Sequence, residues 1–236
     1  MDSSSTGHIV DSAYDDGNIP SNQISIAAHD APRQHIPNEE VTLSEEYDIS
    51  HGRRGMAIIL NHENFELMNK REGSTIDRDT AVAVLTNLQF DVRVYNDLPS
   101  GRLFGELKRL ADEDHTESDC LLVMVMTHGD EDVLYAYDRP YSVDRLWEHF
   151  MGNACPTLLG KPKLFFIQAC RGRAFDKGVK LGCSDLDSDC HVFEPHKYTI
   201  PTTADLLVMY SSYKGHVSWR NPRGGSWFIP ALCVEF

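Results

Sequence analysis

The sequence lacks the features of a membrane or secreted protein. It contains no run of the roughly 20 consecutive apolar residues that a membrane-spanning helix needs. Its first residues, MDSSSTGHIV, lack the positively charged and apolar regions of a secretory signal. We therefore predict a cytoplasmic protein without a membrane partner.

A cysteine framework is lacking as well. The six cysteines have no regular spacing and include no Cys-x-x-Cys pair, so we expect reduced thiols rather than disulfides. A group of metal-binding residue types does occur, but its spacing fits no standard zinc finger: Cys183, Cys190, His191 and His196. We predict no metal and no other cofactor, and we expect His62 and His115 to be ordinary surface histidines.

Positive charge is scarce. The chain has 22 Lys and Arg against 36 Asp and Glu, a net charge of −14, and no basic run. Nucleic-acid binding needs clustered Lys and Arg, so no nucleic-acid partner is expected. The acidic residues are dense in residues 1–50, where Arg33 is the single basic residue and no helical or strand periodicity occurs. That segment is predicted to be a disordered acidic leader.

The remainder of the chain alternates between apolar runs and amphipathic stretches. The apolar runs predict five strands: 56–61, 90–94, 120–126, 163–169 and 206–210. A short hairpin piece is expected over 133–137. Polar residues at which helices are expected to begin precede the amphipathic stretches: Asp77, Ser100, Ser142 and Ser226. This alternation predicts an α/β fold with a mostly parallel central sheet and helices on both faces.

Two reactive side chains follow strands of this sheet. His128 comes directly after the run that ends at Met126, and Cys170 follows the run over 163–169. Ligand sites in parallel sheets lie at the carboxyl ends of strands, and a histidine within hydrogen-bond reach converts a thiol to the nucleophilic thiolate. A lone cysteine after a strand is more often an inert buried thiol, so the surrounding residues decide.

Those residues resemble the caspase family. The pentapeptide Gln168-Ala169-Cys170-Arg171-Gly172 matches a signature of that family, with a histidine upstream. The resemblance extends from Gly55 to Cys233 through further segments in the family's order: Arg71-x-Gly73, Thr127-His128-Gly129, Gly160-Lys161-Pro162-Lys163-Leu164, Ser218-Trp219-Arg220-Asn221 and Gly225-Ser226-Trp227-Phe228. It implies a three-layer caspase-like fold, of which the C-terminal strand and helices would be missing here.

The resemblance also implies roles for individual residues. Cys170 would be the nucleophile and His128 the proton donor and acceptor, with the amides of Gly129 and Cys170 as the oxyanion hole. Three residues would line the primary pocket: Arg71, Gln168 and Arg220. Two guanidiniums and an amide suit a short carboxylate, so the resemblance implies cleavage after aspartate.

Further residues would shape the neighbouring peptide-binding subsites: Ser218, Trp219, Asn221 and Trp227. For the two tryptophans, ordinary core packing is the competing interpretation. Val217 stands where effector members of the family usually carry an aromatic residue, so the second subsite would be more open.

The resemblance divides the chain into a leader (1–50), a large-subunit region (51–172), an inter-subunit linker (173–204) and a truncated small-subunit region (205–236). Activation in this family follows cleavage after aspartate in the leader and the linker. The candidate processing sites are Asp30, Asp185, Asp187 and Asp189; a solvated acidic loop is the competing interpretation of the last three.

Two functions remain open at this point. The first is a cysteine endopeptidase that cleaves proteins after aspartate in the execution phase of apoptosis, once it has itself been activated by proteolysis. The second is a catalytically impaired regulator or decoy that binds an active caspase or its regulators. The partners implied are protein substrates with an aspartate at the cleavage site, other caspases and inhibitor-of-apoptosis type proteins. Without a following edge strand, Leu206 and Val208 are expected to be exposed.

Overall fold

The computed structural model describes residues 46–175 and 203–236. Their centre is a five-stranded sheet in the order β2-β1-β3-β7-β8, in which every neighbouring pair is parallel. The strands are β1 (Arg53–Asn61), β2 (Asp91–Asn96), β3 (Ser118–Met126), β7 (Lys163–Gln168) and β8 (Leu206–Tyr210). The predicted parallel sheet is confirmed.

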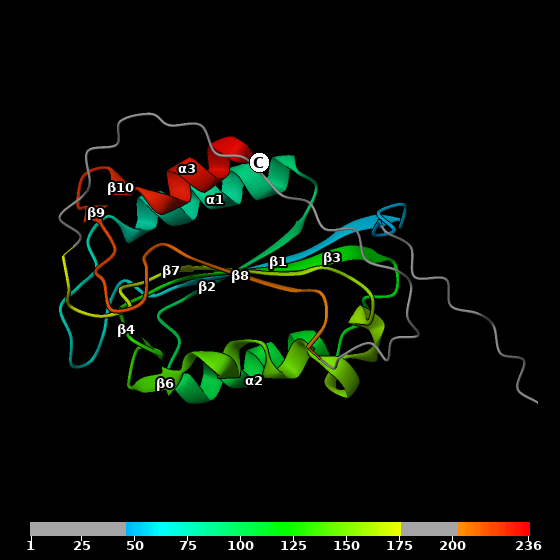
Figure 1. The fold of residues 1–236 in the computed structure, drawn as a ribbon, viewed down its shortest axis with the longest axis horizontal. Helices are drawn as coiled ribbons and strands as arrows, with labels where there is room; N and C mark the ends of the chain where they lie inside the picture. The colour runs from blue at the N-terminus through cyan, green and yellow to red at the C-terminus, as the bar shows by residue number, and fades with distance from the viewer. Residues whose placement is uncertain (1–45, 176–202) are drawn as a thin grey trace, which may run out of the picture. The chain divides into compact units, whose positions relative to one another are not determined.

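Helices cover both faces of this sheet (Figure 1). On one face lie α1 (Ser74–Asn87) and α3 (Phe228–Glu235). On the other lie α2 (Ser100–Ala111) and four short 3-10 helices, η1 (Val143–Leu146), η2 (Glu148–Phe150), η3 (Gly152–Ala154) and η4 (Pro156–Leu158). Successive strand residues point to opposite faces, so Ile58 packs with α2 while Ile59 packs with α1 and α3. The result is the three-layer α/β arrangement.

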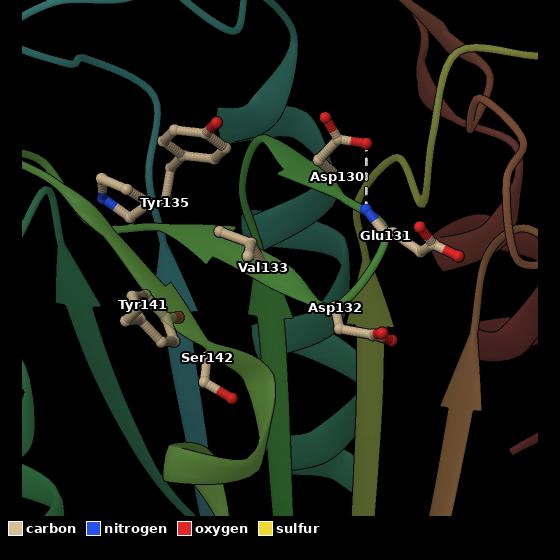
Figure 2. Close-up of a pocket in the computed structure, with 8 residues that line it drawn as sticks. Asp130, Glu131, Asp132, Val133, Tyr135, Tyr141 and Ser142 are labelled. Atoms are coloured by element: carbon tan, nitrogen blue, oxygen red, sulfur yellow. Dashed lines mark hydrogen bonds between the residues drawn. The ribbon is translucent and has the colours of Figure 1, made fainter. Parts of the chain in front are cut away.

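Shorter strands extend from the carboxyl ends of the central ones. β4 (Gly129–Asp130), β5 (Val133–Tyr135) and β6 (Pro140–Ser142) form an antiparallel sheet, which confirms the expected hairpin piece. Figure 2 shows its acidic turn, Asp130 to Asp132, and Tyr135 projecting from β5. Lys214, beyond β8, contacts Asp132 at 3.0 Å and Glu131 at 3.5 Å. β9 (Arg220–Asn221) and β10 (Gly225–Ser226) form a second small pair.

The expected helix starts were wrong in detail. α1 begins at Ser74 after Gly73, and Asp77 lies within its first turn. The Asp77 carboxylate does not cap this helix; it accepts hydrogen bonds from the backbone amide of Ser226. Ser100 is the first residue of α2, and its amide donates to Asp138 at 2.7 Å. In place of one helix after Ser142 there are the four 3-10 segments.

The last expected helix start also shifts by two residues. Ser226 belongs to β10, and α3 begins at Phe228. The Ser226 hydroxyl oxygen nevertheless accepts a hydrogen bond from the amide of Ile229 at 3.1 Å. Ser226 therefore still satisfies one of the free amides at the start of α3.

Two histidines expected at the surface are buried. The side chain of His62 is 0% exposed and that of His115 is 2% exposed. His115 Nε2 lies 3.0 Å from the carbonyl oxygen of Leu110, which it can bind only as a donor. The local sequence pattern around these two histidines does not encode their burial.

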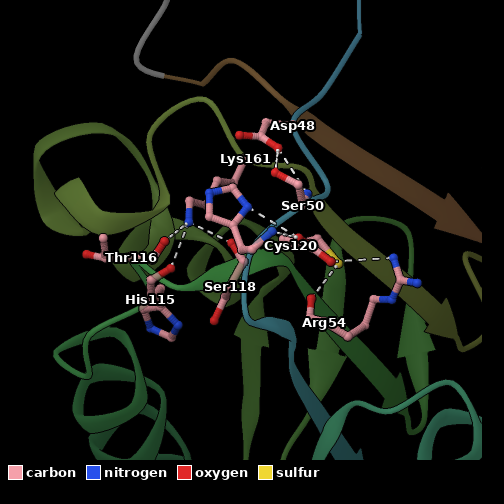
Figure 3. A network of polar contacts seen from close by, with 10 residues as sticks. Asp48, Ser50, Arg54, His115, Thr116, Ser118, Cys120 and Lys161 are labelled. Atoms are coloured by element: carbon pink, nitrogen blue, oxygen red, sulfur yellow. Dashed lines mark hydrogen bonds and ion pairs between the residues drawn. The ribbon is translucent and has the colours of Figure 1, made fainter.

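A lysine ties together the loops at the amino ends of the strands (Figure 3). Lys161 Nζ donates to the carbonyl oxygens of His115 at 2.9 Å and Ser118 at 2.6 Å, and also to that of Thr116. The loop before β3 is thereby fixed to the loop before β7. His128 and Cys170 lie at the opposite, carboxyl ends of β3 and β7. The hydrogen bonds of Lys161 thus link the amino ends of the two strands that carry these residues.

The edge strand β8 exposes a different pair of residues from the one expected. Leu206 and Val208 are partly buried and pack against the core on the α2 face. Leu207 and Met209, on the other face, are 46% and 40% exposed. The expected pair was wrong because strand residues alternate, and α2 with the 3-10 helices reaches the face that carries Leu206 and Val208. Over residues 46–175 and 203–236, no helix has the length and apolarity required to cross a membrane.

Candidate active site

The register of two neighbouring strands places His128 beside Cys170. In the parallel pair β3 and β7, Met126 is paired with Gln168, and the amide of Thr127 continues the ladder by donating to the carbonyl of Gln168 at 3.1 Å. His128 and Cys170 therefore stand two residues beyond the same paired position. Both line one cavity of about 250 Å³. The structure brings the two predicted reactive side chains together.

The His128 ring is held in one orientation. Its Nε2 lies 2.8 Å from the carbonyl oxygen of Asn69, to which it can only donate, and the ring of Phe65 packs against it with centroids 4.7 Å apart. Burial lowers the pKa of His128, and the positive charges of Arg71 and Arg220 lower it further. The neutral imidazole is favoured, with its proton on Nε2 and Nδ1 free to accept one.

The Cys170 sulfur also has a backbone donor. The amide of Ser218 donates to Cys170 Sγ at 3.4 Å, and the side chain is half-buried. Cys170 thus has the partial exposure of a reactive thiol.

Two guanidinium groups occupy the same cavity. Arg71 is 2% exposed and its Nη1 donates to the carbonyl of His62 at 3.1 Å and to Ser74 Oγ at 2.9 Å. Burial lowers the pKa of Arg71 to about 9, and the nearby charge of Arg220 contributes. The carboxylate of the buried Asp77 acts on both arginines and raises the pKa of each, which offsets part of the effect of burial.

Polar atoms without partners line this cavity. Arg220 Nη1 is buried and unpartnered among the described residues, and so is Gln168 Oε1. Gln168 Nε2 is used, since it donates to Ser218 Oγ at 2.8 Å. The unpartnered Arg220 Nη1 is a donor, so the cavity favours a group that brings an acceptor, and a carboxylate suits two guanidiniums best.

Most, but not all, of the predicted site residues line the cavity. Its walls are formed by Arg71, Thr127, His128, Gln168, Ala169, Cys170, Phe175, Val217, Ser218, Trp219 and Arg220. Gly129, Asn221 and Trp227 do not line it. Trp227 stacks on Trp219 with centroids 6.0 Å apart, and the two side chains are 70% and 46% exposed. Ordinary core packing of this tryptophan pair is therefore wrong.

Phe175 is a wall residue that sequence reasoning missed. Its ring lies 5.9 Å from that of Trp219 and is 67% exposed. The neighbouring Ala174 fixes it there, because its amide donates to Gly215 at 2.9 Å and its carbonyl accepts from Val217 at 3.0 Å. Phe175 places an aromatic ring in the wall that Val217 was expected to leave open. The one available signal was a lone aromatic residue shortly after the pentapeptide.

Several predictions concern residues outside the described ranges. These are the processing candidates Asp30, Asp185, Asp187 and Asp189 and the four residues of the weak zinc pattern. Within the ranges described, no group of three or more His, Cys, Asp or Glu side chains is arranged to hold a metal ion.

Comparison with known proteins supports the same family as the site does. The family model described as "Caspase domain" matches residues 54–236. Caspase-1 of Spodoptera frugiperda is 44% identical over 191 residues, which are 80% of this chain and 62% of that protein. Caspase drICE of Drosophila melanogaster is 42% identical over 192 residues, 80% of this chain and 56% of the relative. The chain thus spans about three fifths of the length of these relatives.

The fold agrees with a solved structure of one of them. The crystal structure of Caspase-1 from Spodoptera frugiperda superposes with a TM-score of 0.72 at 44% identity, covering 80% of this chain and 71% of that one. The chain with this sheet, this histidine and cysteine pair and this family model belongs to the caspase family.

Proposed function

We propose that this protein is a cysteine endopeptidase that cleaves polypeptides after aspartate. The observation that carries the proposal is one cavity that joins Cys170 and His128 to a pair of guanidinium groups. The first pair supplies nucleophilic chemistry. The second, Arg71 and Arg220, supplies an anion-binding site beside it.

The reaction follows from the positions of these groups. The Cys170 thiol gives its proton to His128 Nδ1 and attacks the backbone carbonyl carbon of the bound aspartate residue. The amides of Gly129 and Cys170 stabilise the oxyanion. His128 then protonates the leaving amine, and a water molecule that it deprotonates hydrolyses the thioester and restores the thiol.

Specificity for aspartate has a physical cause in the same cavity. A substrate carboxylate supplies the acceptor that Arg220 Nη1 lacks and relieves the repulsion between Arg71 and Arg220. An apolar side chain leaves this donor unpaired, which costs far more than a change of size in an apolar pocket. An asparagine offers an acceptor oxygen but no negative charge, and its NH2 group adds a donor beside two guanidiniums.

The wider setting is proposed on the resemblance to effector caspases. The protein would act in the execution phase of apoptosis, after activation by cleavage at Asp30 and at Asp185, Asp187 or Asp189. Its regions would be a leader (1–50), a large-subunit region (51–172), a linker (173–204) and a truncated small-subunit region (205–236). Other caspases, protein substrates with a suitable aspartate and inhibitor-of-apoptosis type proteins are the proposed partners. Ser218 and Trp219 would contact the substrate next to the aspartate, with Asn221 and Trp227 further out.

The test is hydrolysis of a fluorogenic peptide that ends in aspartate. We expect cleavage by the unaltered chain, none by Cys170→Ala, and cleavage by the control Cys233→Ala, which removes a half-buried thiol outside the cavity. A matched peptide that ends in asparagine is expected to resist. Cleavage that survives Cys170→Ala would contradict the proposal. A silent chain that binds an active caspase would favour the regulator instead.

A further inference from the structure

The loop that orients His128 also presents apolar side chains to solvent. This loop follows β1 and carries Phe65, Leu67 and Met68 just before Asn69, whose carbonyl binds His128. Leu67 is 86% exposed and Met68 is 38% exposed. Exposed apolar groups gathered at one place mark a binding surface more often than isolated ones do.

These side chains line a small cavity next to the proposed active site. It measures about 90 Å³, and its other wall is the hairpin of β5 and β6 from Tyr135 to Pro140. Tyr135 of β5 is one of the hairpin residues that line it. The charged groups at its rim, Asp138 and Arg139, are paired with each other at 2.9 Å. The interior of the cavity is therefore left to apolar contacts.

The loop backbone is fixed rather than free. The Asp97 carboxylate accepts from the amides of Glu63 at 2.7 Å and Asn64 at 3.0 Å. The amide of Glu66 donates to the carbonyl of Tyr137 at 2.9 Å. A binding surface on a preorganised backbone loses little entropy when a ligand is bound.

The position of His128 indicates which part of the substrate lies near this cavity. His128 lines the cavity of Cys170 and the arginines, and Phe65 packs against the His128 ring and lines the apolar cavity. Because the general acid must reach the leaving amine, the part of the substrate after the cleaved bond passes His128. Phe65 contacts the His128 ring directly, and the amide of Tyr135 donates to the carbonyl of His128 at 3.1 Å, so both residues adjoin the histidine.

We infer that Phe65, Leu67, Met68 and Tyr135 form a subsite for an apolar side chain on the leaving-group side of the substrate. This inference rests on the proposed function, since it assumes cleavage at Cys170. It adds a substrate preference that the arginine pocket does not supply. The volume of the cavity suits one side chain within the first few residues after the cleaved bond.

Three substrates separate this inference from the proposed function. Two are quenched peptides that are identical through the aspartate and one following serine, and then continue with Leu-Val or with Thr-Ser. The third carries a fluorophore directly on the aspartate and has no leaving peptide. The readout is the ratio of kcat/KM between the two peptides, which does not depend on the fraction of enzyme that is folded.

We expect the unaltered chain to favour the Leu-Val peptide roughly 3- to 10-fold, as for a partly open apolar pocket. The ratio should fall to about 1 in Leu67→Ser/Met68→Ser. The control Leu159→Ser changes a side chain that is 54% exposed outside both cavities and should keep the ratio.

A ratio near 1 in the unaltered chain, or one that the double substitution leaves in place, would overturn the inference. If the third substrate is still cleaved in that case, the proposed function stands. A folded chain that cleaves none of the three overturns both.

Discussion

Gly129 lies so close to Cys170 that no side chain fits between them. A Cβ atom on Gly129 would stand 2.4 Å from the carbonyl oxygen of Cys170 and 2.9 Å from the Cβ of Ala169. The strand end that carries His128 and the strand end that carries Cys170 can approach to this distance only with glycine at position 129.

We therefore expect Gly129→Ala to push the two strand ends apart. A displacement of about 1 Å at a reacting group costs roughly 100-fold in rate, and kcat/KM for an aspartate peptide measures it. The control is Gly101→Ala in α2, where nothing lies within 4 Å of the added Cβ and alanine favours the helix by about 1 kcal/mol. Full activity in Gly129→Ala would contradict this account of the site.

The part of the site that sequence could predict is the part fixed by strand register. Continuous apolar runs mark β3 and β7 as buried parallel strands, so their carboxyl ends, and with them His128 and Cys170, had to lie at one edge. The pocket role of Arg71 and Arg220 was predicted from the family resemblance, because no local sequence pattern links two residues so far apart in the chain.

The parts that failed depend on contacts between distant segments. The Asp77 carboxylate binds the amide of Ser226, which is distant in sequence, and does not cap its own helix. His62 follows a buried strand and precedes Glu63 and Asn64, so its neighbours in sequence suggest an exposed loop although the ring is 0% exposed. Phe175 gains its place through Ala174 and the loop at Gly215. No periodic pattern of residues in the sequence signals any of these contacts.

Arg220 is expected to determine the preference for aspartate. Arg220→Ala removes the unpartnered donor from the cavity and should lower kcat/KM for an aspartate peptide roughly 100-fold, as the loss of one partner of a buried charge pair does. Arg220→Lys keeps the charge without the forked geometry and should restore part of the activity. Arg223→Ala, on an exposed residue of the turn after β9, is the control. Kinetics close to those of the unaltered chain would refute the pocket assignment.

His62 should make the protein less stable in mild acid. Burial lowers its pKa to about 4 in the folded chain, from 6.5 in the unfolded one. Below pH 6.5 the unfolded state therefore binds a proton that the folded state does not, and the free energy of unfolding falls as the pH falls toward 4. The His62 contribution approaches about 3 kcal/mol.

Urea unfolding at pH 7.5 and pH 4.5 measures this contribution. His62→Gln removes the titrating ring, so its stability should fall less between the two pH values than that of the unaltered chain. His149→Gln, at a half-buried position of η2, is the control. Equal losses in His62→Gln and the unaltered chain would show that His62 is not the responsible group.

Asp97 is expected to act on catalysis through His128. Its carboxylate accepts from the amides of Glu63 and Asn64 and from Asn64 Nδ2 at 2.8 Å, and so holds the loop whose Asn69 carbonyl binds the His128 ring. Asp97 has a φ of 51°, which glycine adopts without strain. Asp97→Gly thus removes the carboxylate without straining the backbone. Gln89→Gly, at an exposed residue with a φ of 66°, controls for the added backbone freedom of glycine.

We expect kcat to fall about 10-fold in Asp97→Gly, as positioning losses do, with KM for a short aspartate peptide little changed. The pH profile separates positioning from general destabilisation. The hydrogen bond to Asn69 raises the pKa of His128, so its loss should shift the acid limb of the kcat/KM profile to lower pH. A fall in kcat with an unmoved acid limb would mean that Asp97 stabilises the loop without acting through the histidine.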